Sequence, residues 1–185
     1  MTAALLVMDV QNGIVQRFED SATLLGKLAG AVRAARTARV PVIFVRVAFR
    51  DGCPEISPAN LTFSALATRG GMGETDPSTQ IHDAVAPQPG DVTVVKKRVS
   101  AFAGSDLSEV LRGAGADTLV LCGIATSGVV LSTVRQAADL DYRLVVLADA
   151  CADSDPEVHR VLLEKVFPRQ AEVIDVATWA ARLAG

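Results

Sequence analysis

The sequence predicts a single α/β domain in which a parallel sheet of about six strands lies between two layers of helices. Short apolar runs alternate with segments of helical periodicity along all 185 residues. Aromatic residues make up only 4% of the chain, which suits a sheet packed with Val, Leu and Ala. Alternation of this kind is typical of right-handed strand–helix–strand units. No linker is rich enough in Gly, Ser or Pro to separate two domains, so we expect one domain over residues 1–185.

The expected strands are the apolar runs 4–10, 40–48, 92–96, 118–122, 144–148 and 171–174. Helices are expected over residues 24–35, 107–111, 128–140 and 156–167, followed by a terminal helix through Trp179. Pro156 suits the first turn of its helix, and Gly113 and Gly115 suit the end of theirs. Residues 49–90 show no strong periodicity and are rich in Gly and Pro, so we interpret them as a lid.

Composition and charge exclude several classes of function. The net charge is -3, and the 18 basic residues are spread along the chain, so no nucleic-acid-binding face is expected. No apolar run approaches the roughly 20 residues that a membrane helix needs, and the first residues lack a secretory leader. The chain has three cysteines, far apart and odd in number. This cysteine usage predicts a reduced, cytoplasmic protein. The absence of a long apolar run predicts that it does not contact membranes.

Ligands of open parallel sheets bind outside the carboxyl ends of the strands, and Asp9 and Lys96 end two of the predicted strands. Asp9 has two interpretations: a turn residue that bonds nearby backbone N–H groups, or a partly desolvated general acid or base. Side chains alternate along a strand, so Lys96 and Lys97 should point in opposite directions. Lys96 would then face Asp9 while Lys97 meets solvent.

Residues 121–130 (LCGIATSGVV) combine a strand, a turn and the start of a helix. Backbone N–H groups at such a helix start, together with the helix dipole, favour a carboxylate or a developing oxyanion. The segment is not a phosphate loop, because no Lys-Ser or Lys-Thr follows Gly128. No G-x-G-x-x-G follows the first strand either, so a dinucleotide cofactor is not expected.

Three motifs, VMDVQN, KKRVSAFAGSDL and LCGIATSGVVLSTVRQAADLDYRLVVLADACAD, resemble the isochorismatase-like superfamily, also called the cysteine hydrolases. The resemblance covers nearly the whole chain in the right order. It implies a three-layer, Rossmann-like α/β/α sandwich, a hydrolase acting on a small-molecule substrate, and a homo-oligomer, either a dimer or a tetramer.

The resemblance assigns the family aspartate to Asp9 and the family lysine to Lys96, four positions before Ser100 of the S-A-F motif. The nucleophilic cysteine of the amidase branches falls at Val129. A non-proline cis peptide is implied at Ile124–Ala125, with the N–H groups of Ala125 and Val129 as an oxyanion hole. Weaker candidates for substrate contacts are Gln11, Phe49, Ser100, Phe102 and Ser127.

Two departures from the family pattern limit the chemistry. The Asp-x-His…His metal site of the nicotinamidase branch is replaced by Arg50-Asp51-Gly52-Cys53-Pro54-Glu55, so no metal and no cofactor is expected. Valine cannot be a nucleophile, and Cys122 lies inside a predicted strand. His82 and His159 are interpreted as a loop histidine and a surface helix histidine, because neither has a partner motif.

Three hypotheses remain open at the level of sequence. The first is a hydrolase that needs no covalent intermediate, as in isochorismatases that hydrolyse a vinyl ether. The second is an amide or ureido hydrolase in which water attacks directly, with Asp9 as the base. The third is a catalytically silent protein that binds a small anion or acts as a scaffold. Site chemistry, and not the fold, must decide among them.

Overall fold

The computed structural model describes residues 2–18 and 21–185. Six strands form one sheet in the order β3-β2-β1-β4-β5-β6, and every neighbouring pair is parallel. The strands are β1 (Ala3–Met8), β2 (Val42–Val47), β3 (Val92–Lys96), β4 (Thr118–Ile124), β5 (Arg143–Ala152) and β6 (Glu172–Ile174). The expected parallel α/β fold is confirmed, and the order is that of doubly wound sheets.

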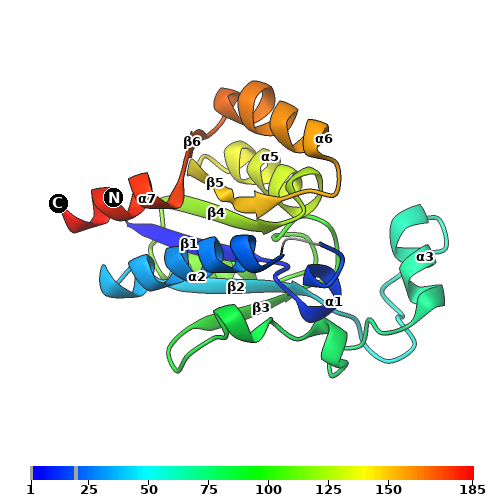
Figure 1. The fold of residues 1–185 in the computed structure, drawn as a ribbon. Helices are drawn as coiled ribbons and strands as arrows, with labels where there is room; N and C mark the ends of the chain where they lie inside the picture. The colour runs from blue at the N-terminus through cyan, green and yellow to red at the C-terminus, as the bar shows by residue number, and fades with distance from the viewer. Residues whose placement is uncertain (1, 19–20) are drawn as a thin grey trace.

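Helices cover both faces of the sheet (Figure 1). The α-helices of the described chain are α1 (Asn12–Val15), α2 (Ser21–Thr37), α3 (Leu61–Arg69), α4 (Leu107–Gly113), α5 (Leu131–Asp139), α6 (Pro156–Val161) and α7 (Val176–Ala184). Helices α2 and α7 pack against each other on one face, and α5 and α6 lie on the other. None of the helices in the described ranges has the length and apolar character needed to cross a membrane.

Two predicted helices differ from the observed ones at their ends. The helix expected over residues 128–140 begins as a π-type turn (Thr126–Val130) and becomes α5 only at Leu131. The helix expected over 156–167 is α-helical only to Val161 and continues as π and 3₁₀ turns to Arg169. Pro168 lies in the last of these turns, where its missing N–H cannot extend an α-helical ladder.

The segment 49–90 contains a helix that periodicity did not predict. Helix α3 begins after Asn60, whose side chain accepts a hydrogen bond from the N–H of Phe63 at 3.0 Å. Phe63 is its one buried residue, and Leu61 is 86% exposed. A helix that buries so little has no clear apolar stripe, which is why its pattern was weak. Figure 1 shows α3 standing away from the sheet.

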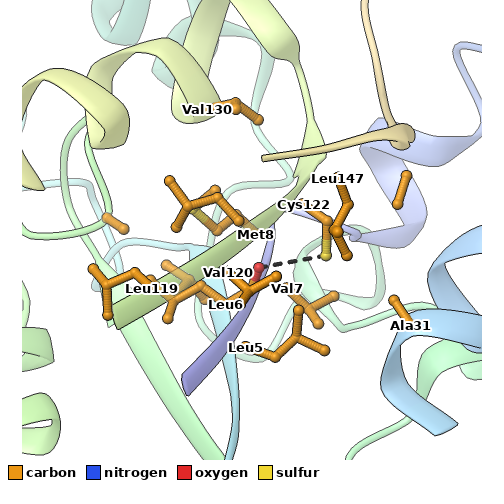
Figure 2. Packing of buried hydrophobic residues seen from close by; sticks show 14 of the residues in the cluster. Leu5, Leu6, Val7, Met8, Ala31, Leu119, Val120, Cys122, Val130 and Leu147 are labelled. Atoms are coloured by element: carbon orange, nitrogen blue, oxygen red, sulfur yellow. Dashed lines mark hydrogen bonds between the residues drawn. The ribbon is translucent and has the colours of Figure 1, made fainter. Parts of the chain in front are cut away.

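The core lies along β1 and β4, at the centre of the sheet. Leu5, Leu6 and Leu119 are fully buried because helices cover both faces of these strands. Figure 2 shows Cys122 inside this cluster, with its thiol directed at the carbonyl oxygen of Leu6, 3.4 Å away. Burial raises the pKa of the Cys122 thiol and raises that of Cys151 to about 12. Both thiols therefore belong to the core and stay protonated.

Strands β1 and β4 approach each other closely where they lead into the site. Met8 pairs with Gly123, and a Cβ atom added to Gly123 would lie 2.0 Å from the carbonyl oxygen of Met8. Gly123 also has a φ of 135°, which L-residues with a side chain rarely adopt. Strand β1 ends at this pair and Asp9 follows it, whereas β4 continues for one more residue to Ile124.

Candidate active site

Asp9 and Lys96 form a buried ion pair at the carboxyl ends of β1 and β3. The Lys96 Nζ lies 2.9 Å from the Asp9 Oδ2, and the side chains are 2% and 8% exposed. Lys96 Nζ also donates to the carbonyl oxygens of Arg98 at 2.9 Å and Val99 at 3.0 Å. An ammonium group has three hydrogens to donate, so these three acceptors fix its position.

The other carboxylate oxygen of Asp9, Oδ1, is buried and accepts no hydrogen bond from the described residues. Leaving such an atom unpaired costs free energy, about 1–3 kcal/mol for an ordinary polar group. Burial raises the pKa of Asp9, and the ammonium of Lys96 opposes that rise. Neither carboxylate oxygen bonds a backbone N–H within the described chain, so the turn interpretation of Asp9 is wrong. Oδ1 therefore keeps its capacity to accept a hydrogen bond unused.

Asp9 itself adopts a left-handed backbone conformation, with a φ of 54°. Asp and Asn are enriched in this region of backbone space because they are less disfavoured there than most residues. The conformation turns the chain sharply out of β1 into α1. It places the carboxylate beside Lys96, which ends the strand two positions away in the sheet.

The turn after β4 contains the position that the resemblance assigned to a nucleophile. The Ile124–Ala125 peptide bond is cis, and Val129 is 2% exposed within the main core. The backbone N–H of Ser127 donates to the Asp153 Oδ2 at 2.7 Å. Ser127 is exposed, whereas its neighbour Thr126 is fully buried. The position that the resemblance assigned to a nucleophile therefore carries a packed, unreactive valine side chain.

His159 contacts this turn, which the sequence did not predict. Its Nδ1 lies 2.8 Å from the hydroxyl oxygen of Thr126, and the side chain is half-buried. Burial lowers the pKa of His159, and the nearby carboxylate of Asp153 opposes the change. His159 lies on helix α6, as expected, but its side chain is half-buried against the turn and is not a free surface group. Spacing alone could not reveal the contact, because 33 residues separate the two partners.

The lowered pKa of His159 predicts a loss of stability at mildly acidic pH. The unfolded chain takes up a proton near pH 6.5, whereas the folded chain resists it. The contribution of His159 to the free energy of unfolding is therefore complete above the pKa of the unfolded chain. It is lost as the pH falls through the lower pKa of the folded chain. Urea unfolding between about pH 7.5 and 5 should show a shallower pH dependence for His159→Gln than for wild type. His82→Gln, at the other histidine, is the matched control and should keep the pH dependence of stability that His159 contributes. An unchanged slope in His159→Gln would contradict the assignment.

We expected Lys97 to be a free surface lysine, but its ammonium group is bound by other residues. Its Nζ donates to the carbonyl oxygen of Ala48 and to Glu74 Oε1, each at 2.7 Å. The same ammonium lies 5.9 Å from the centre of the Phe49 ring. Lys97 and Lys96 do point to different partners, but Lys97 stabilises the segment after β2.

The weaker candidate residues are mostly engaged in packing or structural hydrogen bonds. The Gln11 side chain donates to the carbonyl oxygens of Val47 and Thr79 and accepts from the N–H of Val47. Phe49 is fully buried and makes an edge contact with Phe63 at 5.5 Å.

Phe102 and Ser100, from the S-A-F motif, are also buried. Phe102 stacks on Tyr142 with ring centroids 6.1 Å apart. Ser100 accepts a hydrogen bond from the N–H of Phe102 at 3.3 Å. Of the weaker candidates, Ser127 alone is exposed in the described chain.

The segment after β2, where the nicotinamidase branch holds a metal, contains an ion pair instead. Arg50 contacts the Glu55 Oε1 at 3.0 Å. Nowhere in residues 2–18 and 21–185 do three or more His, Cys, Asp or Glu side chains gather as a metal-ligand group.

Comparison with known proteins places this site in a family context. Residues 3–178 match the model of the isochorismatase domain. The chain is 36% identical to the uncharacterized isochorismatase family protein YwoC of Bacillus subtilis, over 90% of this chain and 86% of YwoC. It is 35% identical to the ureidoacrylate amidohydrolase RutB of Stutzerimonas stutzeri, over 95% of this chain and 76% of RutB.

A solved structure of an isochorismatase family protein from Burkholderia thailandensis has the same fold. It superimposes with a TM-score of 0.87 at 31% identity, over 100% of this chain and 96% of that one. The similarity therefore extends over every element that carries the Asp9–Lys96 pair and the turn after β4.

Proposed function

The chain belongs to the isochorismatase family of hydrolases, and we propose that it cleaves a small, anionic metabolite without a cysteine acyl-enzyme. The observation that carries the proposal is the buried, unpaired Oδ1 of Asp9 beside the ammonium of Lys96. This pair supplies a proton donor or acceptor with a charge partner, while Val129 offers no nucleophile. A reaction that needs only a general acid, the ammonium group of Lys96 and water fits these residues.

Hydrolysis of a vinyl ether is the reaction of this kind that we favour. Protonated Asp9 gives its proton to the terminal alkene carbon, and the alkene electrons form the new C–H bond. The cation that remains is stabilised by the ether oxygen and adds water, which returns a proton to Asp9. The resulting hemiketal then breaks its C–O bond to give a carbonyl compound and an alcohol.

Burial supports the role of Asp9 as the acid, because it raises the pKa of the carboxyl group and favours the protonated form. Lys96 then balances the negative charge that Asp9 carries after the proton has left. Both side chains are nearly inaccessible, so a substrate reaches them only when a neighbouring segment moves. Such enclosure shields Asp9 and Lys96 from bulk solvent and strengthens the electrostatic interaction between them.

The similarity to a ureidoacrylate amidohydrolase favours a second candidate, hydrolysis of an amide or ureido bond. Asp9 would then act as the base for a water molecule that attacks the carbonyl carbon. The N–H groups of Ala125 and Val129 would hold the developing oxyanion. Without a nucleophilic side chain, positioning of the water must supply the rate acceleration that a covalent intermediate would otherwise give.

One assay panel tests both candidates. Wild-type protein and the variants Asp9→Asn and Val129→Cys are incubated with small carboxylates that carry a vinyl ether, an amide or an N-carbamoyl group. We expect wild-type turnover of a vinyl ether and a loss of about 10²–10⁴-fold in kcat/KM for Asp9→Asn. Asn tolerates the left-handed backbone at this position, so the variant should fold.

The matched control is Asp141→Asn, because Asp141 also has a positive φ, of 63°, and is exposed after α5. Retained activity in Asp9→Asn would overturn the proposal. Amide hydrolysis that appears only in Val129→Cys would exclude the second candidate, and wild-type amide hydrolysis would favour it. Thermal stabilisation by these compounds without turnover of any class would make the protein a binding protein instead.

A further inference from the structure

A preformed cavity of about 230 Å³ lies next to the Asp9–Lys96 pair and is not lined by either residue. Gln11, two residues beyond Asp9, forms part of its wall, as does Val47. Val47 is the sheet partner of Lys96. The cavity is therefore a neighbour of the buried pair, with its own lining.

The walls of this cavity are held by specific hydrogen bonds. The Gln11 side chain links Val47 to Thr79 through donors and acceptors between 2.8 and 2.9 Å. In another part of the lining, the Ser78 hydroxyl donates to the carbonyl oxygen of Gly71 at 2.6 Å. Gly71 has a φ of 73°, which lets the chain turn directly after α3. These bonds fix the shape of the cavity before any ligand arrives.

The lining combines an apolar interior with two cationic side chains. Ile14, Val47, Leu66 and Met72 supply the apolar surface. Arg17 and Arg69 also line the cavity, and no described lining residue is acidic.

Neither arginine forms an ion pair within residues 2–18 and 21–185. The Arg17 Nε donates to the carbonyl oxygen of Gly13 at 3.0 Å, which holds the guanidinium group at the end of α1. By contrast, Arg50, Arg160 and Arg182 are each paired with a glutamate. Arg17 and Arg69 thus keep Nη donors for another acceptor.

We propose that this cavity binds a small organic carboxylate with an apolar body. Guanidinium groups match the planar geometry of a carboxylate and can bind it through two parallel hydrogen bonds. The apolar side chains suit the body of such a ligand, since binding pockets usually combine apolar walls with a few placed polar groups. Neither Asp9 nor Lys96 lines this cavity, so the proposal does not depend on the proposed hydrolysis.

Calorimetric titration with benzoate and with hexanoate tests the proposal, and benzamide and hexanamide serve as neutral analogues. The carboxylates should bind wild-type protein and the amides should not. Arg17→Met and Arg69→Met keep an unbranched side chain but lose the charge. Each should weaken carboxylate binding about tenfold or more. The matched control is Arg39→Met, because Arg39 is exposed and does not line the cavity.

Asp9→Asn should bind benzoate as tightly as wild type, whether or not it retains turnover, which separates this test from that of the proposed function. Three results would overturn the proposal: unchanged affinity in both arginine variants, loss of binding in Asp9→Asn with binding kept in the arginine variants, or no carboxylate binding to wild type.

Discussion

Replacing Lys96 with Met should destabilise the protein by about 3–5 kcal/mol at neutral pH, because it leaves the buried carboxylate of Asp9 without its partner. The pair is 2.9 Å apart and almost fully enclosed. Methionine fills a similar volume, so lost packing contributes little. The expected effect therefore comes mainly from the cost of burying Asp9 without its charge partner, and in part from the carbonyl oxygens of Arg98 and Val99, which lose their donor.

The same variant should show a distinctive pH dependence. Burial raises the pKa of Asp9 and Lys96 opposes that rise, so loss of Lys96 raises the pKa further. The folded variant then holds a proton that the unfolded chain releases near pH 4. Its free energy of unfolding should consequently fall as the pH rises from about 4 towards 8. Urea unfolding across this range measures the change.

Two further variants isolate the cause. The double variant Asp9→Asn/Lys96→Met carries no charge at either position, so it should recover most of the lost stability at neutral pH. Lys27→Met breaks an exposed ion pair with Asp149 and should change stability little, because water screens surface pairs. A Lys96→Met protein as stable as wild type at pH 8 would contradict the assignment of Asp9 as a buried carboxylate.

Replacing Gly123 with Ala should cost about 4 kcal/mol or more, at the upper end for single substitutions. The new Cβ would lie 2.0 Å from the carbonyl oxygen of Met8 and within 3 Å of two further Met8 backbone atoms. Strands β1 and β4 would have to separate at the centre of the sheet. The φ of 135° adds a backbone cost for any residue with a side chain.

Gly26→Ala is the matched control, because the same atoms are added where nothing lies within 4 Å. Gly26 is an exposed residue inside α2, so this variant should gain about 0.5–1 kcal/mol. Thermal or urea unfolding of the two variants gives the comparison. A Gly123→Ala protein with wild-type stability would show that the close approach of β1 and β4 is not rigid.

Much of the fold could be predicted from local patterns. The strand expected over 92–96 coincides with β3, and the strand expected over 118–122 lies within β4. The run in β4 is apolar because helices cover both faces of the central strands, whereas the edge strand β3 leaves Val92 and Thr93 exposed. Helix α3 was missed for the opposite reason, since a helix that buries one side chain leaves little periodicity.

The residues of the candidate site also divide into those that the sequence predicted and those that only the structure showed. Strand ends and motif order selected Asp9 and Lys96, because a parallel sheet brings its carboxyl ends to one edge whatever the loops do. The contact between His159 and Thr126 depends on how α6 packs beside the turn after β4. No local pattern encodes the distance between two elements that are far apart in sequence.

By itself, the sequence determined the parallel α/β sheet and the charged residues at the carboxyl ends of its strands, and it placed valine where the resemblance implies a nucleophile. Only the tertiary structure decided that one oxygen of Asp9 is unpaired, that Lys97 is bound to Glu74, and that Arg17 and Arg69 line one cavity. The physical reason is that residue type and periodicity report burial. Hydrogen-bond partners depend instead on the packing of segments that are distant in the chain.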